Sequence, residues 1–279
     1  MPDTRIDCDC AVAAQQSRLF LYVSPLETPL DPELEQAYLS IISPSEAARN
    51  ARLATSVLRQ RDLQARALVR CALSLHAPPA PKDWQFSQSK LGKPSIASCH
   101  NELTHWQFNI SDSENVAVVA ICQDRKVGVD IELSTVADEL LDSAMILSPH
   151  ERTSLKKLPL PERRRRFLDH WMVKEAYLKA RGLGIASMPL YAIAPNFEEP
   201  GRIRFPKLLA SDQQPDADWL FMQFDMNVHG VVSVCLEGTA FPITNLALFI
   251  PLRYPPQRLN WRLLRSTCSV PASDGPAPF

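Results

Sequence analysis

The sequence predicts an α+β protein whose two similar halves are related by a pseudo-two-fold axis, with the active site in the cleft between them. Strand and helix patterns recur in the same order in both parts of the chain. The segment Ser43-Pro-Ser-Glu46 has the form of a capping box, in which serine and glutamate side chains bond to backbone amides at a helix start. Ser148-Pro-His-Glu151 repeats this segment 105 positions later, and the same offset places Glu175 opposite Arg70. A repeat of this kind indicates an internal duplication, and the alternative is chance similarity between common capping signals.

The first half is expected over residues 17–123, after a loose leader of small and polar residues at 1–16. Aromatic and β-branched residues favour strands, apolar residues at helical spacing favour helices, and proline ends a helix because it lacks an amide hydrogen. The expected elements are a strand at 19–23, a helix near 31–42, a long arginine-rich helix over roughly 45–76 that ends before Pro78, and a strand at 115–122.

The second half is expected over residues 124–250. Apolar and other residues alternate in its first strand, at 126–132, so the side chains of Asp130 and Glu132 leave the same face. The remaining expected elements are a helix from Trp171 that ends at Gly182, a strand at 230–236, and a proline-rich, partly disordered tail at 251–279.

The second half also carries a pattern of charged residues that suits a metal ion bound to a phosphate. Glu175 and Lys179 lie four positions apart in the expected helix and therefore share one face. If that face meets Asp130 and Glu132, three carboxylates gather beside a lysine, and oxygen ligands are what magnesium prefers. Each pair alone has an ordinary alternative. The strand acids also fit an exposed sheet edge, and the helix pair also fits a surface salt bridge worth ~0.3–0.5 kcal/mol.

Composition limits the classes of partner and compartment. The chain has 279 residues and a formal net charge of −1, so it lacks the broad basic field that general nucleic-acid binding requires. Its seven cysteines are scattered, with no paired CxxC spacing, which favours buried thiols in a reducing compartment over disulfides or zinc. The first residues lack the basic and apolar regions of a secretory leader, and no apolar run is long enough for a membrane span. We therefore expect a cytoplasmic protein that binds neither nucleic acid nor membranes.

Three further stretches could hold an anion, although each has a more common structural explanation. The turn Lys90-Leu-Gly-Lys93-Pro places two ammonium groups around a glycine, but such turns are usually solvated loops. The segment Phe108–Ser113 passes from a strand into polar residues that could hold a phosphate or simply close a hairpin. Arg61, Arg66 and Arg70 would face the cleft in a two-fold arrangement, yet arginine on a helix usually faces solvent.

Four motifs follow one another along the chain: the lysine-glycine-lysine turn, the Phe-Asn-Ile-Ser segment, Val-Gly-Val-Asp-Ile-Glu and Trp-x-x-Lys-Glu-Ala-x-x-Lys. This succession closely resembles the phosphopantetheinyl transferases. The resemblance covers roughly residues 40–240 and is strongest to the long, two-lobed, surfactin-synthetase-activating type. Members of that family move the 4′-phosphopantetheine arm of coenzyme A onto a serine of an apo carrier protein, with magnesium, and release adenosine 3′,5′-bisphosphate. The resemblance implies that the first half forms the coenzyme A wall and the second half carries the metal and the catalytic residues.

The resemblance also implies roles for individual residues. Asp130, Glu132 and Glu175 correspond to the magnesium ligands. The catalytic residues would be Glu175, as the base for the serine hydroxyl, Lys179, at the diphosphate, and Asp130. A carboxylate held by metal and lysine would stay ionised near neutral pH.

The coenzyme itself would be bound largely by the first half. The implied contacts are Arg61 at the 3′-phosphate, Lys90 and Lys93 at the nucleotide end, Asn109, Ser111 and Asp112 on the opposite wall, and Lys179 at the diphosphate. The family usually has histidine where this chain has Asp112, and an acid there would repel a phosphate. Asp112 is therefore expected either to turn away or to pair with a nearby lysine or arginine, and to alter the affinity for coenzyme A.

Carrier proteins are acidic, so a basic docking surface is expected near the cleft. The best match is the run Arg163–Arg166 with Lys156, Lys157 and Arg152, although such runs are usually solvated helix faces. Because one chain supplies both halves, we expect a monomer. Two alternatives remain from the residues alone: a magnesium-dependent nuclease or phosphohydrolase, and a non-catalytic binder of carrier proteins.

Overall fold

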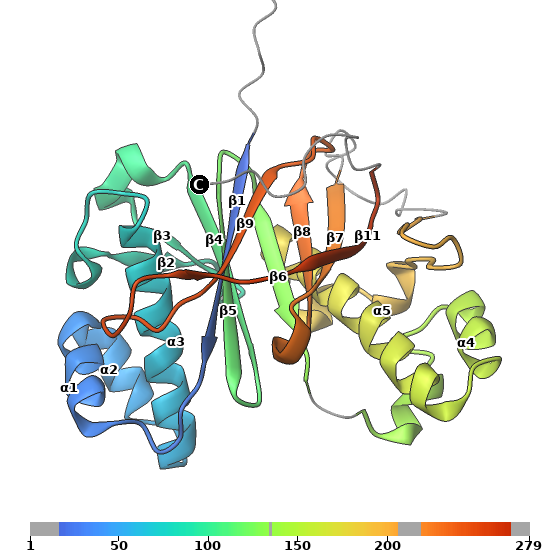
Figure 1. Cartoon of the computed structure of the whole chain (residues 1–279), viewed down its shortest axis with the longest axis horizontal. Coiled ribbons are helices and arrows are strands. Elements are labelled where there is room, and N and C mark those ends of the chain that lie inside the picture. Colours follow the sequence, from blue (N-terminus) through green and yellow to red (C-terminus); the bar gives the residue numbers. More distant parts are fainter. Residues whose placement is uncertain (1–16, 134–135, 206–218, 269–279) are drawn as a thin grey trace, which may run out of the picture.

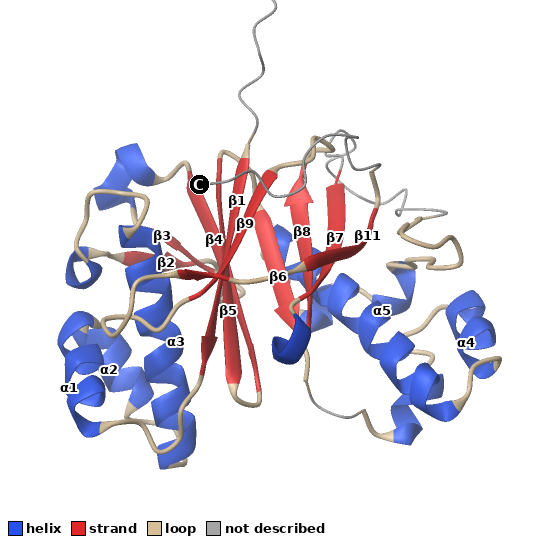
Figure 2. Ribbon diagram, in the orientation of Figure 1, coloured by secondary structure: helices blue, strands red, loops and turns tan. Residues whose placement is uncertain are grey.

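The computed structural model of the chain describes residues 17–133, 136–205 and 219–268. The expected leader at 1–16 and the end of the tail at 269–279 lie outside the described residues. Two β-sheets lie side by side in the middle of the molecule, and the main helices cover their outer faces (Figure 1, Figure 2). The expected α+β class is therefore confirmed. No helix in the described segments combines the length and the apolar character that a membrane crossing requires.

The first sheet has five strands in the order β10-β9-β1-β5-β4, which leaves β4 at an edge. Strand β1 runs antiparallel to β5 and parallel to β9, and β4 runs antiparallel to β5. A small hairpin of β2 and β3 lies beside this sheet. The strands are β1 (Arg18–Pro25), β2 (Phe86–Gln88), β3 (Pro94–Ile96), β4 (Trp106–Ser113), β5 (Val116–Gln123), β9 (Ile243–Leu248) and β10 (Gln257–Arg258), and the covering helices are α1 (Pro32–Ile41), α2 (Pro44–Asn50) and α3 (Ser56–Ser74).

The second sheet has four antiparallel strands in the order β11-β7-β8-β6. Its strands are β6 (Val127–Ile131), β7 (Trp219–Asp225), β8 (Val231–Glu237) and β11 (Arg262–Ser266), and its helices are α4 (Pro149–Lys156) and α5 (Leu160–Arg181). Short 3₁₀ helices occupy Pro81–Asp83, Ser98–Leu103, Asp138–Asp142, Ile185–Ser187, Leu190–Ala192 and Asn227–His229.

Alternation along the strands explains why the sheets pack against each other. Leu19, Leu21 and Val23 of β1 point into a fully buried cluster that also contains Val127 and Val129 of β6. The opposite face of the first sheet buries apolar side chains under α1 and α3, and the opposite face of the second sheet does so under α5. The molecule is therefore a layered α/β/β/α arrangement whose two sheets share one core.

Most local expectations are confirmed, but the long helix over 45–76 is not. Both capping boxes form as expected. The helix breaks into α2 and α3, because the buried side chain of Asn50 donates to the Arg59 carbonyl and to Asp62. The Thr55 hydroxyl then caps a new helix by accepting from the Leu58 amide.

The C-terminal part of the chain also differs from the expected halves. Strand β9 lies within the expected second half, yet it pairs with β1 in the first sheet. Strand β11 returns to the second sheet, where Trp261, next to it, packs edge-on against Phe224 with 5.2 Å between ring centroids. The described part of the tail therefore crosses between the sheets (Figure 1).

The glutamates of the two capping boxes are buried in equivalent surroundings. Glu46 contacts Arg66 and Arg70, which lie four apart on α3. Glu151 contacts His170, at 2.9 Å, and Lys174, at 2.8 Å, which lie four apart on α5. The counterpart of Arg70 is thus Lys174, 104 positions later, and the expected match with Glu175 was wrong by one residue.

Candidate functional site

Close packing of β6 on α5 brings together the charged residues of the second half. A Cβ atom added to Gly128 would lie 2.0 Å from the Ala176 carbonyl oxygen and 2.3 Å from the Ala180 nitrogen. Only glycine allows the strand to lie this close to the helix backbone. As a result, Asp130, two residues along the strand, faces Lys179 of the helix.

Asp130 lies at the centre of a buried hydrogen-bond network. Its Oδ1 accepts from the Lys179 Nζ at 2.6 Å and from the Ser111 Oγ at 2.9 Å, and Lys179 also donates to Ser111 at 2.8 Å. Its other oxygen, Oδ2, is buried and finds no donor among the described residues, and the same holds for Oε1 of Glu175. Two carboxylate oxygens from neighbouring elements are therefore left without the partners that buried anionic oxygens require.

Burial raises the pKa values of these three acids, and repulsion from a neighbouring acid adds to the shift in Glu175 and Glu132. Burial and then the charge of Asp130 raise the pKa of Glu175 to about 7, although Lys179 opposes the shift. Burial raises the pKa of Asp130 despite the charge of Lys179. Burial also raises the pKa of Glu132, with a further contribution from Asp130, while a hydrogen bond from Ser113 opposes it. A bound cation would relieve this repulsion.

Asp130 and Glu175 therefore fit as two oxygen ligands of a divalent cation. Within the described segments, no group of three or more acidic, histidine or cysteine side chains is already arranged around a metal position. Glu132, the third expected ligand, accepts a hydrogen bond from the Ser113 Oγ at 3.0 Å. The chemistry of the donor set fits magnesium, which retains several waters and needs few protein carboxylates.

One face of β4 supports this cluster. Asn109, Ser111 and Ser113 alternate along the strand and all point toward β6. Asn109 Oδ1 accepts from the Val129 amide at 2.9 Å, so Asn109 ties the two sheets together on the face of β4 toward β6. Ser113 was part of the segment singled out in the sequence but was given no role of its own, although its spacing of two from Ser111 was the available signal.

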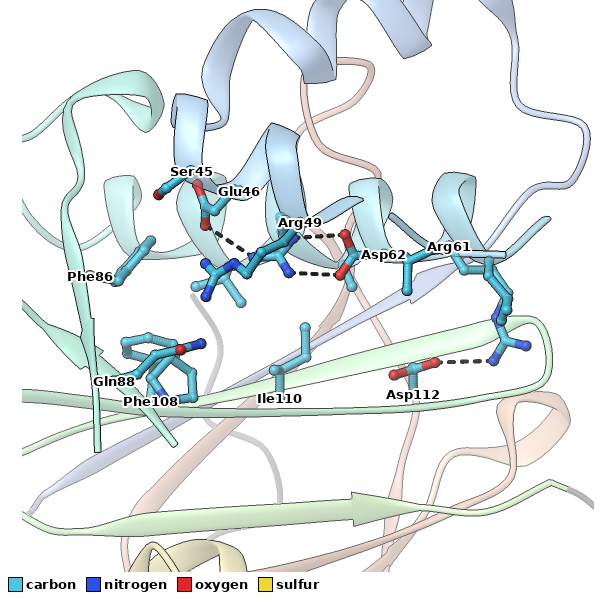
Figure 3. Close-up of a pocket in the computed structure, with 16 residues that line it drawn as sticks. Ser45, Glu46, Arg49, Arg61, Asp62, Phe86, Gln88, Phe108, Ile110 and Asp112 are labelled. Carbon is cyan, nitrogen blue, oxygen red and sulfur yellow. Dashed lines mark hydrogen bonds and ion pairs between the residues drawn. The ribbon is translucent and has the colours of Figure 1, made fainter. Parts of the chain in front are cut away.

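The other face of β4 borders a pocket of about 690 Å³ between the strand, helices α2 and α3, and the β2–β3 hairpin (Figure 3). Phe86 and Phe108 lie at one end, and Arg61 and Asp112 lie at the other, where they point toward each other. The Arg61 Nη2 lies 3.0 Å from the Asp112 Oδ2, so the expected pairing of Asp112 with a nearby arginine is confirmed. Phe86 had no sequence signal, because only the fold brings the hairpin to this pocket.

Three other predicted residues lie away from the pocket. Lys93 Nζ donates to the carbonyl oxygens of Val127, at 3.2 Å, and Ala180, at 2.9 Å, and burial lowers its pKa to about 8. Lys93 thus connects β6 to the end of α5 and is not among the residues that line the pocket. Lys90 is exposed in the preceding turn. Arg70 does not face the cleft, because it is buried with Glu46 and donates to two backbone carbonyls.

The expected basic docking surface is largely engaged by other groups. Arg163 donates to three backbone carbonyls at the end of α4. Arg164 pairs with Asp138 at 2.8 Å, and Lys156 pairs with Asp142 at 2.7 Å. Arg165 and Lys157 remain exposed. The positive charge of this surface is thus smaller than the sequence indicates.

Comparison with known proteins gives a family model and several relatives that share one described activity. Residues 126–232 match the family model of the 4′-phosphopantetheinyl transferase superfamily. The chain is 32% identical to the 4′-phosphopantetheinyl transferase HetI of Nostoc sp. over 179 residues, which cover 63% of this chain and 75% of HetI. It is 27% identical to the 4′-phosphopantetheinyl transferase Sfp of Bacillus subtilis over 183 residues, which cover 66% of this chain and 79% of Sfp. A putative 4′-phosphopantetheinyl transferase of Synechocystis sp., slr0495, is 29% identical over 167 residues, which cover 60% of this chain and 65% of that protein.

Proposed function

Because the chain belongs to the 4′-phosphopantetheinyl transferase superfamily, we propose that it transfers the 4′-phosphopantetheine arm of coenzyme A to a serine of an apo acyl or peptidyl carrier protein. The observation that carries this proposal is the position of β4. This edge strand has the pocket on one face and the Asp130–Glu175–Lys179 cluster on the other. A long ligand that bends around the strand would reach both.

Coenzyme A has the shape and the charges for this path. Its adenine ring would pack near Phe86 and Phe108, and its 3′-phosphate would lie at the Arg61 end of the pocket. The diphosphate would pass β4 where Ser111 and Asp112 point to opposite faces. Lys179 would then supply positive charge to the diphosphate.

The reaction follows from this placement. The Oγ of the carrier serine forms a bond to the phosphorus that bears pantetheine, and the bond from that phosphorus to the bridging oxygen breaks. Adenosine 3′,5′-bisphosphate leaves with the bridging oxygen. Glu175, whose buried Oε1 has no donor in the described structure, accepts the serine proton. Magnesium held by Asp130 and Glu175, with Glu132 nearby, would supply charge that stabilises the developing negative charge on the diphosphate oxygens.

The proposal extends to the setting of the enzyme. Because β4 and β6 of a single chain supply both sides of the site, the enzyme would act as a monomer. Cys71, Cys122 and Cys235 are buried free thiols, which suits the reducing cytoplasm. An acidic carrier protein would meet the exposed Arg165 and Lys157 near α4 and α5.

The test is incubation of the chain with coenzyme A, magnesium and a panel of apo carrier proteins, followed by intact mass spectrometry. We expect one carrier protein to gain the mass of one phosphopantetheine arm, and chelation of magnesium to stop the gain. Asp130→Ala and Glu175→Ala should each slow transfer by ~10²–10³-fold or more, by analogy with the loss of preorganised charge stabilisation. Glu162→Ala, which removes an exposed carboxylate from the first turn of the same helix, is the matched control.

The outcomes separate the candidate functions. Release of adenosine 3′,5′-bisphosphate without modification of any carrier protein would instead support the phosphohydrolase alternative. Near-normal transfer by Asp130→Ala or Glu175→Ala would remove that residue from the proposed site.

A further inference from the structure

The charges that line the pocket cancel. Three arginines and three acids border it, so their formal charges sum to zero. Most of these charges are already paired within the pocket: the Arg66 guanidinium binds both oxygens of Asp62, at 2.8 and 2.9 Å, and also approaches Glu46. The charged lining residues are Glu46, Arg49, Arg61, Asp62, Arg66 and Asp112.

The pair of Arg61 and Asp112 is the most consequential of these. The side chain of Arg61 is 24% exposed and that of Asp112 is 48% exposed, so a ligand in the pocket can reach both. Asp112 neutralises Arg61 at the end of the pocket away from Phe86 and Phe108, where a 3′-phosphate would lie under the proposed function. A phosphate there would gain attraction from Arg61 but suffer repulsion from Asp112 at nearly the same distance, so the two contributions offset each other.

We infer that Asp112 is a specificity-determining residue that removes most of the preference for a 3′-phosphate, so this enzyme uses both coenzyme A and 3′-dephospho-coenzyme A as pantetheine donors. The inference rests on the proposed function. With the dephosphorylated donor, the serine oxygen forms the same bond to phosphorus and the same phosphorus–oxygen bond breaks. The leaving group is then adenosine 5′-monophosphate, and the serine proton again passes to Glu175.

Binding of two product nucleotides tests the pocket without catalysis. Isothermal titration calorimetry would compare adenosine 3′,5′-bisphosphate with adenosine 5′-monophosphate as probes. We expect the unmodified protein to bind them with dissociation constants within about threefold of each other. Asp112→Asn keeps the size of the side chain and frees Arg61, so it should favour the bisphosphate by tenfold or more, a change of about 1.4 kcal/mol. Glu27→Gln is the matched control, because it removes the acid of an exposed ion pair with Arg253, 3.5 Å apart and outside the pocket.

Transfer rates then connect binding to the reaction. The ratio of kcat/KM for coenzyme A to that for dephospho-coenzyme A should be near unity in the unmodified enzyme and should rise at least tenfold in Asp112→Asn, with an unchanged melting temperature. A tenfold preference for the 3′-phosphate in the unmodified enzyme, or an unchanged ratio in Asp112→Asn, would overturn this inference alone. Absence of transfer from either donor, with nucleotide binding intact, would overturn the proposed function instead.

Discussion

Replacing Gly128 by alanine tests whether the contact between β6 and α5 builds the site. The added Cβ would lie 2.0 Å from the Ala176 carbonyl oxygen and 2.3 Å from the Ala180 nitrogen, whereas real Cβ contacts are essentially never shorter than 3.0 Å. Both obstacles are backbone atoms of the helix, so no side chain can rotate away. The strand and the helix must therefore separate by about 1 Å.

The magnitude follows from this separation. Overpacking typically costs ~1–3 kcal/mol, and backbone obstacles place this substitution at the upper end. At ~2–4 °C per kcal/mol for a chain of this size, the melting temperature should fall by ~6–12 °C. Because the displacement moves Asp130 away from Glu175 and Lys179, the transfer rate should also fall, by ~10²-fold for a 1 Å misplacement.

Thermal unfolding by circular dichroism and the carrier-protein mass assay measure the two effects. Gly184→Ala is the control, because Gly184 has an ordinary φ of −86° and an added Cβ would lie in ordinary contact with the Ser187 Oγ, at 3.9 Å. The control should keep its melting temperature within a few degrees and its full rate. An unchanged melting temperature and rate in Gly128→Ala would refute the close packing from which the site is built.

Three further substitutions test other parts of the structure. Lys93→Met leaves two buried backbone carbonyls without a donor, so it should lower the free energy of unfolding in urea by ~1–3 kcal/mol. The KM for coenzyme A should change little. A raised KM at unchanged stability would instead indicate that Lys93 contacts the nucleotide. Burial lowers the pKa of His170, so its contribution to stability is complete above the ordinary value of 6.5 and is lost as the pH falls through the lowered one. Between about pH 7.5 and 5.5, the free energy of unfolding in urea should therefore fall less in His170→Gln than in the unmodified protein. In His150→Gln, which changes an exposed histidine, it should fall as much as in the unmodified protein. Equal decreases in the two variants would contradict the role given to His170. Arg165→Glu should slow transfer to an acidic carrier protein ~10-fold at low ionic strength and little at high ionic strength, and an effect independent of salt would exclude electrostatic docking.

The parts that could be predicted from sequence are those set by neighbouring residues. Each capping box is closed by bonds within four residues, so its pattern is sufficient. The alternation in β6 correctly separates Val129, in the shared core, from Asp130, in the site. Asp130 and Lys179 face each other because β6 packs closely on α5, and Gly128, on the same side of the strand as Asp130, makes that packing possible.

The parts that could not be predicted depend on contacts between distant residues. The break between α2 and α3 is stabilised by Asn50 bonding to residues of the next helix, and no local helix breaker marks it. The pairing of β9 with β1 joins segments more than 200 residues apart, and the period of a strand does not identify its partner. Lys93 has the spacing of a phosphate ligand, but the fold places its ammonium group against backbone carbonyls.

The correspondence between the halves explains why the first half, as far as the structure describes it, has no counterpart of the Glu175–Lys179 pair. Lys174 and Arg70 occupy equivalent positions beside their capping glutamates, 104 residues apart. By the same offset, Glu175 corresponds to Cys71, a buried thiol whose pKa burial raises to about 12 and which therefore stays neutral. Lys179 corresponds to Leu75, which carries no charge. The long helix of the first half therefore offers no equivalent base or cation, and that half instead provides a pocket of balanced charge.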